Sequence, residues 1–255
     1  MSMYGSGSAP EPIVNRMRAA ATDGAAYGAW CSIPSPLTAE LLAGAGFDFL
    51  ILDCQHGIDF SDLLPMLQAM SRSVTTPVVR VPGNDPYWIG RALDLGAQAI
   101  IVPMVSTRAD AERAAMACRH FPDGNRSWGP LRSRMFLGAD IPHINREVLC
   151  LVMIETEEGI GNAREICSVP GIDGIFIGPG DLGITLGIAP GTTDGLERLD
   201  AAIDTVRQAC EEAGIIPGIA RGAEFVERGF RIVTVTGDLE LIGAAAKSIP
   251  PRPGA

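Results

Sequence analysis

The chain has 255 residues, of which 47% are apolar and 5% aromatic, and its formal net charge is −10. This length is typical of one complete α/β barrel of roughly 250 residues, with enough apolar material for a single large core. The acidic balance and the lack of a Lys/Arg cluster argue against nucleic-acid binding, which needs a basic face to displace counterions. No apolar run reaches the roughly 18 residues of a membrane helix, so a membrane partner is not expected.

The ends of the chain and its cysteines bear on domain organisation and location. No apolar N-terminal segment precedes a cleavage site, and the six cysteines are scattered without a C-x-x-C pair. We interpret the cysteines as reduced, buried thiols and expect a cytoplasmic protein. We predict a disordered tail over residues 1–15, one barrel domain over residues 16–249 and a flexible tail over residues 250–255.

Short apolar runs rich in Ile, Val, Leu and Phe alternate with longer segments of helical spacing. The runs are nearly continuous in apolar residues, which is typical of parallel strands covered on both faces. The predicted strands are Tyr27–Ser32, Phe47–Cys54, Pro77–Val81, Ala99–Met104, Val148–Glu155, Gly174–Gly178, Ile216–Ala220 and Arg231–Thr236.

Helices are predicted between these strands. Ser61 and Thr107 stand where N-caps are expected, and four glycines follow last helical turns, where a left-handed residue is favoured: Gly46, Gly96, Gly214 and Gly229. The predicted helices are Ala39–Ala45, Ser61–Ser71, Pro86–Leu95, Thr107–His120, Glu157–Cys167, Leu196–Ala213, Ala223–Arg228 and Asp238–Ser248. Eight strand–helix units predict a single (β/α)8 TIM barrel of the α/β class, with a doubly wound open sheet as the alternative.

The longest stretch without a predicted element runs from residue 121 to residue 147. Long irregular loops inside a domain usually serve as lids or partner contacts. This one carries Arg126, Trp128, Arg132, Arg134 and Phe136.

Polar residues follow the apolar runs of four predicted strands: Asp53, Arg80, Glu155 and Asp181. Because catalytic residues of such barrels lie at the carboxyl ends of strands, these four side chains predict a site on one rim. Two carboxylates on adjacent strands repel each other unless a cation lies between them, and oxygen ligands suit Mg²⁺ or Mn²⁺. Glu155 and Asp181 are therefore the candidate metal ligands; the alternative is that each caps the following helix.

His56 is the candidate proton carrier, because it follows a buried strand closely and titrates near neutral pH. Asp53 is a candidate to orient it or to hold a metal-bound water, whereas Asp94 is a partner only if the fold brings it near. Arg80 has the permanent charge and planar geometry that suit a carboxylate or developing oxyanion. The alternative for Arg80 is a salt bridge to a barrel carboxylate.

A G-x-G-x-x-G pattern spans Gly178, Gly180 and Gly183. Alone it is a weak dinucleotide signal; here it falls in the sixth unit, contains Pro179 and precedes a poor helix. We interpret the glycines as exposing backbone N–H groups that receive a small carboxylate.

Taken in order, several short motifs of the chain resemble those of the HpcH/HpaI aldolases, the class II pyruvate aldolases that act on hydroxy-oxo acids. The resemblance runs from about Tyr27 to about Ile249. The motifs that carry it are Asp53-x-Gln55-His56, Pro77-Val-Val-Arg80, Leu93-Asp94-x-Gly96-Ala97-Gln98, Val102-Pro103-Met104-Val105, Glu155-Thr-x-Glu-Gly159 and Phe176-Ile-Gly-Pro-Gly-Asp181-Leu182.

The resemblance implies a role for each matching residue. Glu155 and Asp181 bind a divalent metal (Mg²⁺, Mn²⁺ or Co²⁺), which pyruvate chelates, and the backbone around Gly180 and Asp181 also receives the pyruvate carboxylate. Arg80 steadies the enolate oxygen. His56, oriented by Asp94, works with a metal-bound water as acid and base.

The resemblance also implies that Trp30 and Asp53 lie at the pocket, and that the protein is a homohexamer of three dimers that exchange the C-terminal helix. Two positions depart from the better-known members. Gln55, a candidate substrate-binding residue, stands where Glu is usual before the His, and Met153 stands where Gln is common. Neither departure affects a proposed ligand, so the reaction class is retained.

Our hypothesis is a carbon–carbon lyase that cleaves 4-hydroxy-2-oxo acids to pyruvate and an aldehyde, and also forms them, through a metal-held pyruvate enolate. Lys247 is the only lysine, and it lies at no strand end, which argues against a Schiff-base mechanism. Open alternatives are a 3-hydroxyacyl-CoA lyase, an oxaloacetate decarboxylase and a non-catalytic sensor barrel. Arg221 and the segment Arg126–Phe136 are the candidates for selecting the aldehyde, and would favour an acidic one if they face the pocket.

Overall fold

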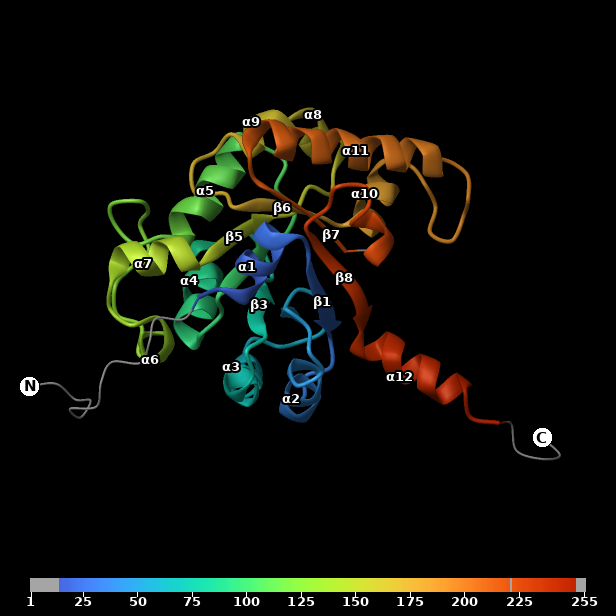
Figure 1. The fold of residues 1–255 in the computed structure, drawn as a ribbon. Coiled ribbons are helices and arrows are strands. Elements are labelled where there is room, and N and C mark those ends of the chain that lie inside the picture. Colours follow the sequence, from blue (N-terminus) through green and yellow to red (C-terminus); the bar gives the residue numbers. More distant parts are fainter. Residues whose placement is uncertain (1–13, 221, 251–255) are drawn as a thin grey trace, which may run out of the picture.

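The computed structural model describes residues 14–220 and 222–250, in which eight parallel strands close into a barrel (Figure 1). Each strand pairs with the next along the chain, and β8 pairs with β1. This confirms the predicted barrel, with strand ends shifted by a few residues. The strands are β1 (Ala26–Cys31), β2 (Phe49–Asp53), β3 (Thr76–Arg80), β4 (Ala99–Val102), β5 (Leu149–Val152), β6 (Gly174–Ile177), β7 (Ile216–Ile219) and β8 (Ile232–Gly237).

The helices surround the barrel. Those predicted at Pro86–Leu95 and Leu196–Ala213 have the predicted bounds, whereas the one predicted at Glu157–Cys167 is interrupted at Asn162. The prediction for Ala223–Arg228 was wrong in kind, because only a 3₁₀ turn forms there, η2 (Ala223–Phe225). The helices are α1 (Arg16–Asp23), α2 (Pro36–Ala43), α3 (Leu63–Ala69) followed by the 3₁₀ turn η1 (Met70–Arg72), α4 (Pro86–Leu95), α5 (Arg108–Cys118), α6 (Arg134–Leu137), α7 (Ile141–Glu147), α8 (Glu157–Gly161), α9 (Ala163–Cys167), α10 (Pro179–Thr185), α11 (Leu196–Ala213) and α12 (Asp238–Lys247).

The predicted helix ends are mostly confirmed. Thr107 and Asp110 form a reciprocal capping box at α5. The four predicted left-handed glycines all have positive φ, from 69° at Gly214 to 109° at Gly96. Ser61 is not the N-cap of α3, because the helix begins after Asp62, which makes no side-chain cap hydrogen bond.

The predicted N-terminal tail falls mostly on residues 1–13, and the predicted C-terminal tail on residues 251–255; both lie outside the described residues. Asn15 belongs to the folded barrel. It is buried, its side chain caps α1, and its backbone N–H donates to Glu147 Oε2 at 3.0 Å. Met17, in the first turn of α1, belongs to the same buried cluster as Phe49 and Phe176 inside the barrel, so α1 closes the amino-terminal end.

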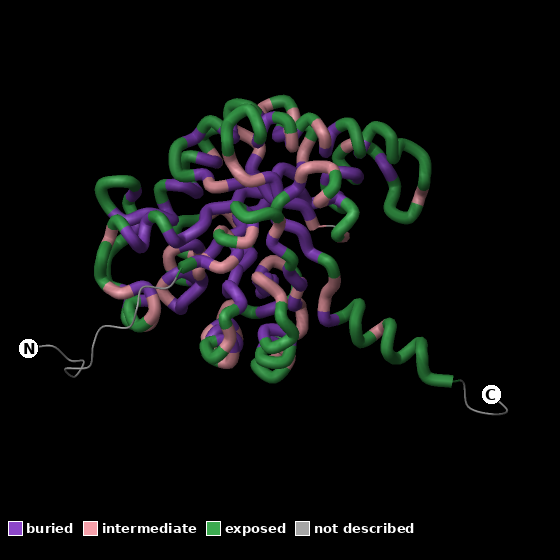
Figure 2. The backbone as a smooth tube through the Cα atoms, viewed as in Figure 1, coloured by how far each residue is buried: buried purple, intermediate pink, exposed green. Residues whose placement is uncertain are grey.

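The core has two layers, and strand residues are buried on both faces (Figure 2). One layer fills the barrel interior and the other lies between strands and helices. The six cysteines are free and buried, as predicted. No helix in the described part of the chain is long and apolar enough to cross a membrane.

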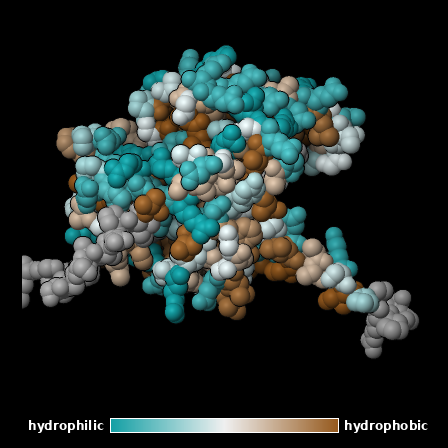
Figure 3. Space-filling model, in the orientation of Figure 1, coloured by the Kyte–Doolittle hydropathy of each residue, from teal (hydrophilic) through white to brown (hydrophobic). Residues whose placement is uncertain are grey.

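The last helix, α12, extends away from the barrel (Figure 1). Only its first residue, Asp238, is buried, and the helix contacts β1 and β8. Its apolar side chains Leu239, Leu241 and Ile242 are exposed, and Figure 3 shows apolar surface along this part of the chain. The helix therefore presents an apolar face that the barrel of the same chain does not cover.

Candidate active site

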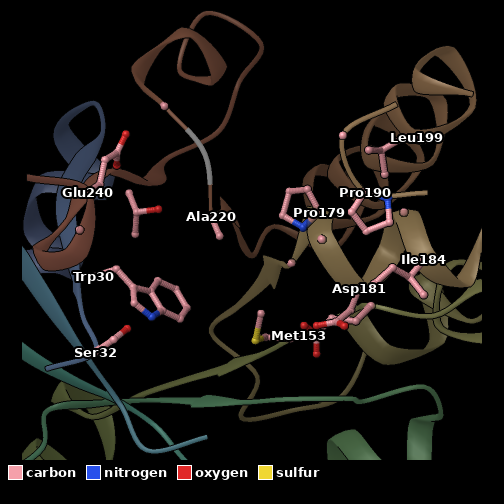
Figure 4. Close-up of a pocket in the computed structure, with 18 of the residues that line it drawn as sticks. Trp30, Ser32, Met153, Pro179, Asp181, Ile184, Pro190, Leu199, Ala220 and Glu240 are labelled. Carbon is pink, nitrogen blue, oxygen red and sulfur yellow. The ribbon is translucent and has the colours of Figure 1, made fainter. Parts of the chain in front are cut away.

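A cavity of about 1030 Å³ opens at the carboxyl ends of the strands (Figure 4). Polar side chains from β1, β3, the segment after β5 and α10 line one part of it: Trp30, Arg80, Glu155 and Asp181. Apolar side chains from α10, α11 and the segment between them line another part: Ile184, Ile188, Pro190, Leu196 and Leu199. The predicted strand-end residues Arg80, Glu155 and Asp181 thus share one pocket.

Asp53 and Arg80 form a buried pair at the ends of β2 and β3, which the sheet register places side by side. The guanidinium donates from Nε to Oδ1 at 2.7 Å and from Nη2 to Oδ2 at 2.6 Å. Burial raises the pKa of Asp53, but hydrogen bonds and charge from Arg80 outweigh it and hold the pKa below its ordinary value. The alternative interpretation of Arg80, a salt bridge to a barrel carboxylate, is thus what the structure shows.

Trp30 completes this cluster from β1. Its indole N–H donates to Asp53 Oδ2 at 3.1 Å, and the Arg80 guanidinium lies 4.7 Å from the centre of its ring. Trp30 and Arg80 face the cavity, so the cluster forms one wall of the pocket and presents a paired guanidinium to it. Asp53 orients Arg80 and Trp30, and no hydrogen bond between Asp53 and His56 is present.

Glu155 lies on the other side of the pocket, three residues beyond β5, and is 1% exposed. Its Oε2 accepts the backbone N–H of Met104 at 2.9 Å. Burial raises the pKa of Glu155, and the negative charge of Asp181 contributes in the same direction. The two carboxylates are thus close enough to repel each other, as the sequence predicted.

Asp181 stands in the first turn of α10, a helix that the sequence analysis missed. Pro179 occupies its first turn, where a missing N–H has no consequence, and Asp181 is exposed to the pocket. The backbone N–H groups of Gly180 and Asp181 belong to the first turn of the helix, where no intrahelical acceptor exists. Gly180 and Asp181 therefore combine a carboxylate with two N–H donors at the edge of the cavity.

Gln55 and His56 lie in the turn that follows Asp53 at the end of β2. His56 is exposed, and its charge lowers the pKa of Glu155 slightly against the larger effect of burial. The backbone N–H of Gln55 donates to Asp53 Oδ1 at 3.1 Å, and the buried side-chain oxygen Oε1 of Gln55 has no hydrogen-bond partner. Neither side chain lines the cavity directly.

Asp94 is not brought near His56 within the chain. It lies in the last turn of α4, which runs back to the amino-terminal ends of the strands, and it pairs with Arg126 at 2.7 Å. The segment from residue 121 to residue 147 packs at that same end, where Arg132 donates to the backbone oxygens of Leu67 and Leu95. Of the two candidates for selecting the aldehyde, the Arg126–Phe136 segment therefore does not line this cavity, and Arg221 lies outside the described residues.

The donor set fits a divalent metal ion that keeps open positions. In residues 14–220 and 222–250, no three His, Cys, Asp or Glu side chains converge on a metal position; Glu155 and Asp181 are the two carboxylates that could hold an ion. A buried carboxylate whose pKa is raised by burial and by a second carboxylate is stabilised by a cation between them. Oxygen ligands and several open positions suit Mg²⁺ or Mn²⁺ better than zinc.

Sequence reasoning missed two contributors to this region. Asp238 accepts the backbone N–H groups of Ser32 and Ile33, which joins the start of α12 to the cavity rim. Met104 contributes a backbone N–H to Glu155. The Val102–Val105 motif was the available signal for Met104, but its residue types carry no obvious chemistry.

A closed parallel barrel with charged residues converging on its carboxyl-end rim has the layout of a TIM-barrel enzyme. Residues 26–245 match the family described as HpcH/HpaI aldolase/citrate lyase, and the chain belongs to this family. It is accordingly a carbon–carbon lyase.

Relatives of known activity span nearly the whole chain. The hydroxypyruvate/pyruvate aldolase of Rhizorhabdus wittichii is 40% identical over 92% of this chain and 97% of its own length. A 4-hydroxy-2-oxo-heptane-1,7-dioate aldolase of Salmonella typhimurium is 38% identical, with 89% of each chain covered.

Solved structures agree with the fold. A family member from Burkholderia cenocepacia superimposes with a TM-score of 0.81 at 32% identity, covering 88% of this chain and 93% of its own. The citrate synthase SbnG superimposes with a TM-score of 0.79 at 27% identity, covering 89% and 92%.

Proposed function

We propose that this chain is a divalent-metal-dependent aldolase that cleaves 4-hydroxy-2-oxo acids to pyruvate and an aldehyde and catalyses the reverse addition. The observation that carries the proposal is the pairing of Glu155 with Asp181 in one pocket. Neither carboxylate forms an ion pair with a basic side chain in the described residues, and the chain is similar to aldolases of pyruvate and hydroxy-oxo acids.

Glu155 and Asp181 hold the metal ion, Mg²⁺, Mn²⁺ or Co²⁺. When bound, the ion supplies Lewis-acid polarisation of the 2-oxo group. The N–H groups of Gly180 and Asp181 at the start of α10 receive the substrate carboxylate. Gly180 presents no side chain to this position, and nothing lies within 4 Å of where its Cβ would be, so the backbone is accessible to a small anion.

Arg80 stabilises negative charge on the reacting oxygen. Asp53 engages Nε and Nη2 of the guanidinium, which leaves Nη1 as the group for substrate. The same ion pair prevents the guanidinium from turning away, so its charge is positioned before substrate arrives. Trp30 packs against the guanidinium and excludes water from that side.

His56 moves the proton between the 4-hydroxyl group and the solvent. Its exposed position suits exchange with water, and its charge acts on the Glu155 side of the pocket. The proposed orientation of His56 by Asp94 requires another copy of the chain, because α4 places Asp94 at the opposite end of this barrel.

An acyl-CoA substrate is less well supported. Its phosphates would need accessible cations near the cavity, and no arginine of the Arg126–Phe136 segment lines the cavity. Arg126 is buried and bonded to Asp94, and Arg132 is bonded to two backbone oxygens. A keto acid needs only Arg80, the metal ion and the N–H groups of α10.

We also propose that the protein is a homohexamer in which α12 packs on a neighbouring copy. The exposed apolar residues of α12 support this, since a free helix of this kind gains stability by covering its apolar side. Native mass spectrometry tests it: we expect a sixfold mass, and smaller species after replacement of Leu241 and Ile242 by Glu. A monomeric native protein would refute the assembly and, with it, the orientation of His56 by Asp94, but not the proposed roles of Glu155, Asp181 and Arg80.

Metal removal and substrate comparison test the function. Pyruvate release from a panel of 4-hydroxy-2-oxo acids should be lost on treatment with EDTA and restored by Mg²⁺, Mn²⁺ or Co²⁺. Full turnover in EDTA, or a covalent adduct trapped by borohydride with pyruvate, would disprove the metal mechanism. Replacing His56 by Ala should lower turnover while pyruvate binding persists.

A further inference from the structure

Met104 has an unusual backbone. Its φ is 56°, in the left-handed region, and it is the one non-glycine residue with positive φ in the part of the chain that the structure describes. L-residues with a Cβ are strained there. The side chain is 50% exposed, so its packing does not account for the conformation.

The strained residue sits in a bulge between β4 and β5. Met153 donates its N–H to the oxygen of Val102 at 2.8 Å and accepts the N–H of Val105 at 3.0 Å. Pro103 and Met104 therefore stand between two bonds to a single residue of the neighbouring strand. Since Pro103 has no N–H, Met104 carries the one backbone donor of the bulge.

That donor is directed at Glu155. The Met104 N–H reaches Oε2 at 2.9 Å, and Glu155 is 1% exposed, so the carboxylate has little freedom. The other oxygen, Oε1, lies against the end of β6: a Cβ added at Gly178 would be 2.5 Å from it. The bulge and Gly178 hold the carboxylate from two sides, next to the helix that carries Asp181.

We propose that the Pro103–Met104 bulge is a positioning device for Glu155, and that Met104 acts through its main-chain N–H and not through its side chain. The left-handed conformation turns this N–H out of the strand ladder and toward the carboxylate, which leaves Oε1 on the side of Gly178 and Asp181. This inference rests on the proposed role of Glu155 as a metal ligand. A bulge that only ended β4 would not affect metal binding.

Three substitutions at position 104 distinguish the contribution of the main-chain N–H from that of the side chain. Met104→Gly accepts the left-handed conformation without strain, and Met104→Ala removes the side chain; both retain the N–H. Met104→Val is β-branched and strongly disfavours positive φ, so the N–H should turn away. Mn²⁺ affinity of each purified protein is measured by calorimetry without substrate, and folding is checked by thermal unfolding.

We expect the Gly and Ala variants to bind Mn²⁺ within about twofold of wild type, and the Val variant to bind at least about tenfold more weakly. In turnover assays the Val variant should need more Mn²⁺ while recovering most of its kcat at saturation. Wild-type affinity in a folded Val variant, or tenfold loss in both Gly and Ala variants, would overturn the proposal.

Glu155→Gln distinguishes the two proposals. If it binds Mn²⁺ as wild type does, the ligand assignment and the positioning role both fail. If it loses Mn²⁺ while Met104→Val does not, only the positioning role fails. Should Met104→Val not fold, replacing residue 104 by the α-hydroxy acid analogue of methionine removes the N–H alone; the same tenfold loss is expected, and wild-type affinity there overturns the inference.

Discussion

The two halves of the active-site rim are built in opposite ways. On β1 to β3, the charges of Asp53 and Arg80 satisfy each other through two hydrogen bonds, and Trp30 adds a third. On β5 and α10, Glu155 and Asp181 carry the same sign of charge, and a backbone N–H is the one hydrogen-bond donor that the described residues supply to the Glu155 carboxylate. The first half is electrostatically complete in the folded chain, and the second is not.

This difference indicates that the half with Glu155 and Asp181 is the one that binds a cation. A paired, buried ion pair contributes rigidity, and losing one partner leaves an uncompensated charge. Two neighbouring carboxylates that form no ion pair oppose folding slightly and attract a cation strongly. Mutations in the two halves should therefore differ in their effect on stability. Those that break the Asp53–Arg80 pair should reduce it, whereas those at Glu155 and Asp181 should reduce turnover without reducing stability.

The largest expected effect is on turnover. Glu155→Gln and Asp181→Asn should each lower retro-aldol kcat/KM on the order of 10³-fold, because loss of a ligand removes several kcal/mol of charge stabilisation. Neither should lower the unfolding temperature, because each removes one of two repelling charges. Glu157→Gln, an exposed carboxylate in the first turn of α8, is the matched control and should leave both quantities unchanged. Unchanged turnover in Glu155→Gln would disprove the assignment of this half.

The next largest effect is expected on the free energy of unfolding, for mutations of the Asp53–Arg80 pair. Asp53→Asn should reduce the free energy of unfolding by about 3–5 kcal/mol at pH 7, because Arg80 would remain buried and unpaired. The pKa of Asp53 is lowered in the folded state, so its stabilisation is present above its unfolded pKa, about 3.9, and is lost as pH falls through the folded value. The gap between wild type and variant should therefore narrow below about pH 4.

Urea unfolding between pH 7 and pH 3 measures this gap. Glu212→Gln is the control, since it breaks an exposed pair with Arg164 and should change the free energy of unfolding by less than about 1 kcal/mol. Equal stability of Asp53→Asn and wild type at pH 7 would mean that the β2–β3 half is not held together by this pair.

Local sequence was sufficient for the barrel and for the residues on its rim. Buried parallel strands are continuous apolar runs, and the polar residue that ends each run must lie at the rim once the barrel closes. Helix α10 was missed because its start, Gly178 to Gly180 with Pro179 between, has the composition of a loop. A proline in the first turn is nevertheless compatible with a helix.

Pairings across the chain were not predictable in the same way. Asp53, a candidate to orient His56 or to hold a metal-bound water, binds Arg80, and Asp94 binds Arg126, 32 residues away. Such partners depend on which loops pack together at each end of the barrel, which residue spacing does not encode. The role of Met104 could not be predicted for another reason. Its hydrogen bond comes from the main chain, and any residue other than proline supplies the same donor.

The smallest effect is expected at Met153, which lies on the cavity floor between the two halves (Figure 4). It is 1% exposed, and its Cε is 2.9 Å from where a Cβ on Gly178 would lie, so the thioether is packed against β6. Met153→Gln keeps the length of the side chain but buries an amide, which should reduce the free energy of unfolding by about 1–3 kcal/mol if no partner is found. Because no proposed ligand moves, kcat/KM for pyruvate release should change by less than about tenfold.

Met153→Leu is the matched control, since it conserves volume without adding polarity and should cost less than about 1.5 kcal/mol. Measuring kcat/KM of the two variants with a set of aldehydes separates the effect of side-chain polarity at position 153 from the effect of side-chain shape. If only Met153→Gln alters aldehyde preference, a polar group at position 153 interacts with the aldehyde. A loss of turnover as large as that of Glu155→Gln would instead mean that Met153 shapes the carboxylate half itself, and that the two halves are not independent.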